Sequence, residues 1–95
     1  MIRIYQISTP RECKYAYMSY DYAKSMLKME DYKLVAEYEV PVKDVQDTLN
    51  KVWDEGNNGE LQSRFPGMHS VSVSDIIEVD NIKYYTDTFG FKEVQ

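Results

Sequence analysis

The fold of this 95-residue chain is decided by its C-terminal stretch Ser74-Asp75-Ile76-Ile77-Glu78-Val79-Asp80-Asn81-Ile82-Lys83-Tyr84-Tyr85-Thr86. Two runs rich in β-branched and aromatic residues flank the pair Asp80-Asn81, and these two residues suit a two-residue turn between antiparallel strands. The stretch therefore predicts a β-hairpin. Residues 91–94 predict a short last strand beside it.

Upstream of the hairpin, the spacing of apolar residues predicts two further strands and two helices. Residues 1–8 and 32–40 alternate with a period of two, which is typical of strands that bury one face. Spacings of three and four predict a helix over residues 12–29, with Ser19 as an alternative N-cap, and a second helix over residues 43–55 that Gly56 ends. Residues 56–69 predict an irregular loop.

Together these elements follow the order β-α-β-α-β-β, which predicts an α+β fold. The simplest arrangement is a mainly antiparallel sheet with both helices packed on one face. A chain of this length can bury one hydrophobic core, so residues 1–95 are expected to form a single domain.

The composition restricts the partners and the compartment. Sixteen acidic residues against 11 basic ones give a net charge of −5, which disfavours direct binding to nucleic acid or to an anionic membrane. The chain has no apolar run of the ~20 residues that span a bilayer. The lone cysteine, Cys13, excludes an internal disulfide and fits a reducing compartment, so we expect a cytoplasmic protein.

The sequence offers one catalytic hypothesis, a small hydrolase that uses His69, Ser70 and Asp75. A nucleophilic serine needs a base within hydrogen-bond reach, and strand alternation alone does not bring these side chains together. We therefore favour a structural role, in which Ser74 and Asp75 bind backbone amides in a bend. No zinc-ligand spacing and no glycine-rich phosphate loop is present, so neither a metal nor a cofactor is expected.

Two other groups of side chains allow more than one interpretation. The carboxylates Asp75, Glu78, Asp80 and Asp87 surround the predicted hairpin, where they could hold a hard cation or do acid–base chemistry, although a solvated rim is commoner. Tyr17 and Tyr20 fall off the stripe of the first predicted helix. If they are exposed, they suit a protein interface.

Two C-terminal motifs carry a family resemblance. They are Met68-His69-Ser70-Val71-Ser72-Val73-Ser74-Asp75-Ile76-Ile77 and Tyr84-Tyr85-Thr86-Asp87-Thr88-Phe89-Gly90-Phe91-Lys92-Glu93-Val94. The chain resembles the YodL-like domain family in these motifs, and also at residues 4–6 and 31–35. The resemblance implies a small protein or appended module of Gram-positive bacteria, often encoded on conjugative elements, with no established catalytic activity.

The matching positions leave two interpretations open. In the structural one, Gly90 takes a positive φ in a bulge, Phe89 and Phe91 anchor the core on either side, and Asp75 and Asp87 cap amides. In the other one, the motif is a partner-binding site. The candidate binding residues are His69, Ser72, Ser74, Asp75, Asp87, Phe89 and Phe91.

We therefore expect a non-enzymatic accessory protein of a bacterial mobile element that binds an as yet unidentified protein partner. Binding is expected at an exposed sheet edge or at the loop of residues 56–69. The alternative is an acidic mimic of nucleic acid that inhibits a host defence or maintenance protein, prompted by the net charge of −5. An unpaired edge strand also makes a homodimer possible.

Overall fold

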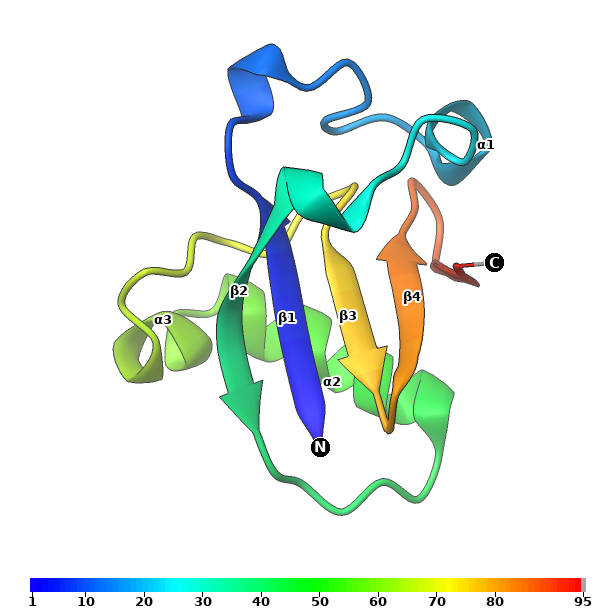
Figure 1. The fold of residues 1–95 in the computed structure, drawn as a ribbon. Helices are drawn as coiled ribbons and strands as arrows, with labels where there is room; N and C mark the ends of the chain where they lie inside the picture. Colours follow the sequence, from blue (N-terminus) through cyan, green and yellow to red (C-terminus); the bar gives the residue numbers. More distant parts are fainter. Residues whose placement is uncertain (95) are drawn as a thin grey trace.

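Five antiparallel strands form the framework of the protein (Figure 1), and the computed structural model describes residues 1–94. The spatial order is β2-β1-β3-β4-β5, so that the first strand lies inside the sheet. The strands are β1 (Ile2–Ile7), β2 (Tyr32–Tyr38), β3 (Ile76–Val79), β4 (Ile82–Thr86) and β5 (Phe91–Glu93). The predicted α+β class and its antiparallel sheet are confirmed.

The C-terminal hairpin forms at the predicted residues. Asp80 and Asn81 both have positive φ, 48° and 73°, which is the backbone of the tight turns that connect twisted antiparallel strands. Ile77 pairs with Tyr84 on the neighbouring strand, and β5 extends the sheet by pairing Phe91 with Thr86.

Helices α2 (Val45–Asn57) and α3 (Glu60–Arg64) cover one face of the sheet, and Figure 1 shows α2 crossing behind the strands. The N-cap of α2 is Asp44, whose carboxylate accepts a hydrogen bond from the Asp47 amide. The apolar side of α2 meets one side of each strand and forms the first core cluster: Ile2, Ile4, Ala36, Tyr38, Leu49, Val52, Leu61, Met68, Val71, Ile77 and Val79.

The predicted end of α2 at Gly56 is wrong. The helix continues through Gly56 to Asn57, and a short third helix occupies part of the predicted loop. A Cβ atom at Gly56 would lie 2.3 Å from Cγ2 of Val71. Glycine is therefore required here because the segment before β3 crosses close to the helix.

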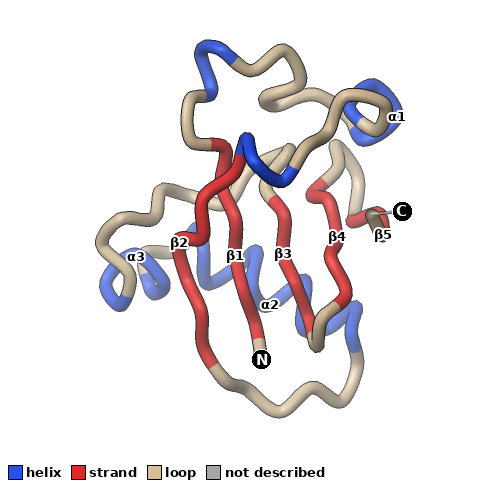
Figure 2. Tube along the Cα trace, viewed as in Figure 1, coloured by secondary structure: helices blue, strands red, loops and turns tan. Residues whose placement is uncertain are grey.

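The predicted helix over residues 12–29 is also wrong, because only α1 (Tyr20–Ala23) is α-helical there. Tyr17 has a φ of 65°, which stops a helix just before α1. The alternative start is confirmed, since the Ser19 hydroxyl accepts a hydrogen bond from the Tyr22 amide. Figure 2 shows that most of the excursion between β1 and β2 is loop, with two 3₁₀ turns besides α1.

This excursion covers a second core cluster, formed by Ile7, Tyr15, Ala23, Tyr32, Ile76 and Tyr85. Side chains alternate along a strand, so Ile7 in β1 points away from the face where Ile2 and Ile4 meet α2. The sheet is thus buried on both faces, by α2 and α3 on one side and by the α1 segment near one end of the other.

A bulge in β2 changes the predicted face of Leu34. Ile4 pairs with Ala36 and Tyr5 pairs with Leu34, so Val35 is an additional residue without a partner in β1. The extra residue interrupts the alternation, and Leu34 is exposed although the sequence places it with Tyr32 and Ala36.

Candidate functional site

The segment before β3 forms a buried corner around Asp75, which is 2% exposed. Its Oδ2 accepts hydrogen bonds from Gln6 Nε2 and from the Ser72 amide, both at 3.0 Å. Burial disfavours the charged form and raises the pKa of Asp75 to about 6, although the hydrogen bonds from Ser72 and Gln6 oppose the shift. The expected amide-binding role of Asp75 is confirmed.

Ser74 ties three parts of the chain together at this corner. It has a φ of 83°, which is unusual for a residue with a Cβ. Its Oγ accepts a hydrogen bond from the amide of Tyr17, which also has a positive φ, and its carbonyl accepts one from Tyr32 Oη at 2.6 Å. The corner thus fixes the α1 segment and β2 against β3, which is a structural role.

The geometry does not assemble a hydrolytic relay. His69 Nδ1 lies 3.0 Å from the backbone carbonyl of Ser70, whereas the Asp75 carboxylate is bound to Gln6 and Ser72. Within residues 1–94 no hydrogen bond joins the side chains of His69, Ser70 and Asp75 into a chain from acid to base to nucleophile.

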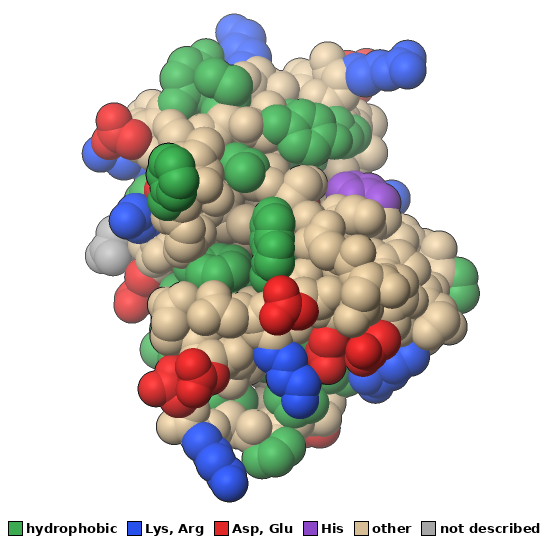
Figure 3. Space-filling model, turned by 180° about the vertical axis from the view of Figure 1, so that it is seen from behind, with side chains coloured by type: hydrophobic (Ala, Val, Ile, Leu, Met, Phe, Trp, Pro, Cys, Tyr) green, Lys and Arg blue, Asp and Glu red, His purple; other side chains and the backbone are tan. Residues whose placement is uncertain are grey.

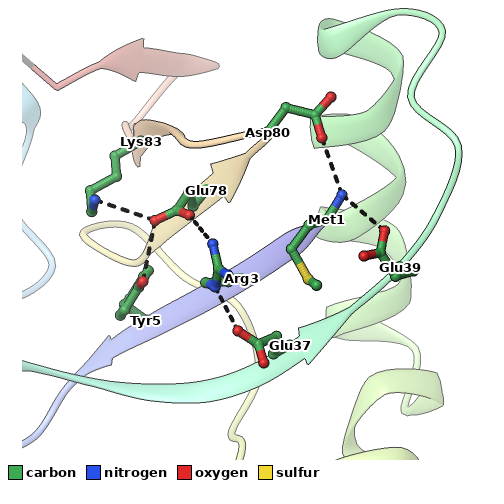
Figure 4. A network of polar contacts seen from close by, with 8 residues as sticks. All are labelled: Met1, Arg3, Tyr5, Glu37, Glu39, Glu78, Asp80 and Lys83. Atoms are coloured by element: carbon green, nitrogen blue, oxygen red, sulfur yellow. Dashed lines mark hydrogen bonds and ion pairs between the residues drawn. The ribbon is translucent and has the colours of Figure 1, made fainter.

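Glu78 and Asp80, two more of the hairpin carboxylates, are engaged in ion pairs (Figure 4). Glu78, only 4% exposed, accepts from Arg3 at 2.6 Å, from Tyr5 at 3.2 Å and from Lys83 at 3.3 Å. Burial raises the pKa of Glu78, but Arg3 and Lys83 outweigh burial, so the pKa lies below its ordinary value. Asp80 binds the N-terminal ammonium group at 3.1 Å.

The turn between β4 and β5 is held rigidly by Asp87. Its Oδ1 accepts hydrogen bonds from the Tyr20 amide at 3.1 Å and the Thr88 amide at 2.8 Å, and its own amide donates to the Gly90 carbonyl at 3.0 Å. Gly90 has a φ of 69°. The predicted amide capping by Asp87 and the positive φ of Gly90 are therefore both confirmed.

The two phenylalanines of this turn have different surroundings. Phe91 is half-buried and packs against the first core cluster, as predicted. The prediction that Phe89 anchors the core is wrong, because its side chain is 89% exposed. Phe89 lies at the tip of the turn, between the exposed residues Thr88 and Gly90, and strand alternation does not return it to the core.

A groove of about 200 Å³ lies between α2 and this turn. Its walls are Asn50 and Trp53 from the helix and Thr86, Asp87, Gly90 and Phe91 from the strands and their turn. Trp53 belongs by its spacing to the apolar stripe that predicts the helix over residues 43–55, yet it is 38% exposed. Figure 3 shows this side of the molecule, with hydrophobic side chains near its centre and charged side chains below them.

Thr86 is the other residue of the groove that sequence reasoning missed. It is 1% exposed, and its Oγ1 atom has no hydrogen-bond partner within residues 1–94. Alternation along β4 directs Thr86 toward the helix side of the sheet. The sequence does not show that a groove lies beside this end of the strand, so Thr86 could not be predicted as part of it.

The candidate residues thus separate into two places. His69, Ser72, Ser74 and Asp75 belong to the buried corner or its immediate neighbourhood, whereas Asp87 and Phe91 line the groove and Phe89 projects beside it. Of the two tyrosines that could be exposed, Tyr17 is exposed, whereas the ring of Tyr20 packs on Tyr85 with centroids 5.2 Å apart. The groove offers aromatic surface and hydrogen-bond acceptors, which suit binding.

Residues 1–94 contain no group of three or more His, Cys, Asp or Glu side chains that could hold a metal ion. None of the helices in this range is both long enough and apolar enough to span a membrane.

Comparison with known proteins gives one finding. No curated protein and no solved structure matches the chain. The YodL-like domain matches residues 1–95, the whole sequence, and includes both the buried corner and the β4–β5 turn. The chain therefore belongs to the YodL-like domain family.

Proposed function

We propose that the protein is a non-catalytic module that binds a protein partner through the turn surface, which we define as Trp53, Asp87 and Phe89. The observation that carries the proposal is the 89% exposure of Phe89 on a turn that hydrogen bonds hold rigid. Binding has to restrict only the two χ angles of an aromatic ring carried on such a turn, and aromatic residues are enriched at the centres of interfaces.

We favour the turn surface over the two binding surfaces expected from the sequence. In the segment of residues 56–69, Leu61 is buried in the first core cluster and Phe65 stacks on Tyr38, so its hydrophobic groups are already occupied. The free edge of β2 is interrupted by a bulge and carries the exposed charges of Lys33 and Glu37, features that oppose strand addition. A homodimer through the edge of β2 is therefore a weaker proposal.

The biological setting in this proposal is that of an accessory protein of a bacterial mobile element. It is supported only by the chain's resemblance to the YodL-like domain family, which carries that setting with it. The proposal includes no catalytic step, because no relay of acid, base and nucleophile is formed by His69, Ser70 and Asp75.

The acidic mimic of nucleic acid is the second proposal, and the structure offers it less support. Such a mimic needs carboxylates that face solvent without a cation. Around the hairpin, Glu78 binds Arg3 and Lys83, Asp80 binds the N-terminal ammonium group, and Asp75 is buried. A mimic's complex should weaken steeply with added salt, whereas a complex centred on Phe89 should change little.

Partner capture with matched variants tests the leading proposal. Wild-type protein, Phe89→Ser and Leu34→Ser are used as baits in a Gram-positive host lysate, and enriched proteins are quantified by mass spectrometry. Leu34 is the control because it is also an exposed hydrophobic residue and lies in the bulge of β2, outside the turn surface. We expect Phe89→Ser to lose the partner and Leu34→Ser to retain it, with both variants folded by circular dichroism.

Two outcomes would contradict the proposal. One is equal enrichment by wild-type protein and Phe89→Ser. The other is that no protein is enriched by a wild-type bait whose folding has been verified.

A further inference from the structure

We propose that the groove beside the β4–β5 turn accepts an arginine side chain of the protein partner. This inference rests on the proposed function, because the arginine would enter while the partner covers Phe89. Beyond that function, it specifies which kind of partner side chain the groove binds. The groove combines a negative charge, hydrogen-bond acceptors and an aromatic wall.

Asp87 provides a carboxylate whose orientation is already fixed. The amides of Tyr20 and Thr88 both donate to Oδ1, and no hydrogen bond within residues 1–94 reaches Oδ2. The carboxylate therefore has one oxygen that positions it and a second that is free to accept from a ligand. A prearranged acceptor of this kind costs little entropy when a cation binds.

The remaining polar groups of the groove are also acceptors. Thr86 Oγ1 is buried without a partner, and a ligand N–H would satisfy it. Asn50 adds a side-chain carbonyl whose Oδ1 already accepts a hydrogen bond from Gln46 Nε2 at 3.2 Å and keeps a second lone pair for a ligand. None of the six lining residues is cationic, so Asp87 gives the groove a negative charge that a basic side chain complements.

Trp53 makes the other wall and favours arginine over lysine. A cation over the face of a tryptophan ring is attracted by the electron-rich face, and the planar, weakly hydrated guanidinium group also stacks on it. A volume of about 200 Å³ holds one side chain and is below the ~300 Å³ at which small-molecule pockets begin. The size thus fits a single residue of a partner.

The test uses a small probe in place of the partner. N-acetyl-arginine methylamide is titrated into the full chain, with the citrulline and lysine counterparts as controls, because citrulline has nearly the same shape without the charge. Trp53 is the single tryptophan, so its fluorescence reports the groove directly. Backbone amide shifts of Asp87 and Gly90 provide a second readout.

We expect a saturable change with arginine, a weaker one with lysine and none with citrulline. Asp87→Asn keeps an oxygen for the amides of Tyr20 and Thr88 and should weaken arginine binding about fivefold, as expected for a partly exposed ion pair. Glu30→Gln removes one negative charge from an exposed residue outside the groove and should leave the affinity unchanged.

The inference is overturned if citrulline binds as well as arginine, if lysine binds at least as tightly, or if Asp87→Asn binds the arginine probe like wild type. Its failure can be distinguished from failure of the proposed function. Partner capture that depends on Phe89 with no arginine binding would overturn only the arginine site. Arginine binding together with capture that survives Phe89→Ser would overturn only the proposed function.

Discussion

Replacing Asp75 by asparagine should remove the dependence of stability on pH that this carboxyl group imposes. Asp75 is 2% exposed, and burial raises its pKa from 3.8 to about 6 in the folded protein. The folded state therefore binds a proton at higher pH than the unfolded state does. Stability that is present while Asp75 is protonated is lost as the pH rises from about 4 through about 6.

The size of the effect follows from the same shift. Two pKa units correspond to about 3 kcal/mol of unfolding free energy at 1.36 kcal/mol for each unit. Asparagine keeps a carbonyl oxygen for Gln6 and Ser72 but cannot ionise. We expect the free energy of unfolding of Asp75→Asn, minus that of wild type, to increase by about 3 kcal/mol between about pH 4 and pH 8.

Urea unfolding of both proteins across this pH range measures the difference. Far-ultraviolet circular dichroism and Trp53 fluorescence provide two probes of the same transition. Taking the difference cancels titrating groups that the two proteins share, such as Glu78, whose lowered pKa acts in the opposite direction. Ser70→Ala, a change in an exposed neighbour, should follow wild type. Parallel curves for wild type and Asp75→Asn would refute the reasoning.

Two further substitutions test the packing of α2 and the ion pairs of the sheet. Gly56→Ala should lower the free energy of unfolding by about 1–2 kcal/mol, because overpacking against Val71 outweighs the better helix propensity of alanine. The control is Gly67→Ala, which has open space around it and should show no such loss in the same urea titration. If Gly56→Ala is as stable as wild type, the close approach is not limiting. Arg3→Met should lower the free energy of unfolding at pH 7, because it removes one cation from the buried carboxylate of Glu78. Because protonation of Glu78 removes the uncompensated charge, the loss should shrink toward pH 4, and a loss that is constant with pH would argue against this origin.

The elements that the sequence predicted correctly are those specified by nearby residues. The hairpin of β3 and β4 depends on Asp80 and Asn81, which adopt the turn backbone themselves. The prediction of a helix over residues 12–29 was wrong because Tyr17 has a positive φ, which interrupts a helix. This backbone accompanies a hydrogen bond from the Tyr17 amide to Ser74, 57 positions away. A spacing of apolar residues carries no information about such a distant contact.

The candidate site was predictable only in part for a similar reason. The amide-binding roles of Asp75 and Asp87 follow from the chemistry of short acidic side chains in turns. The roles of Trp53 and Phe89 do not, because an aromatic residue in a sequence reads as core unless its exposure is known. The groove itself depends on how far α2 lies from the β4–β5 turn, which tertiary packing determines.

The interior position of β1 has a consequence for how the chain is made. β1 and β2 leave the ribosome early and can pair at once, but the other side of β1 must wait for β3, which begins at Ile76. Until then the nascent chain exposes a row of free amide and carbonyl groups beside Ile2 and Ile4. Synthesis therefore passes through a period in which this side of β1 is unpaired, and emergence of β3 ends it.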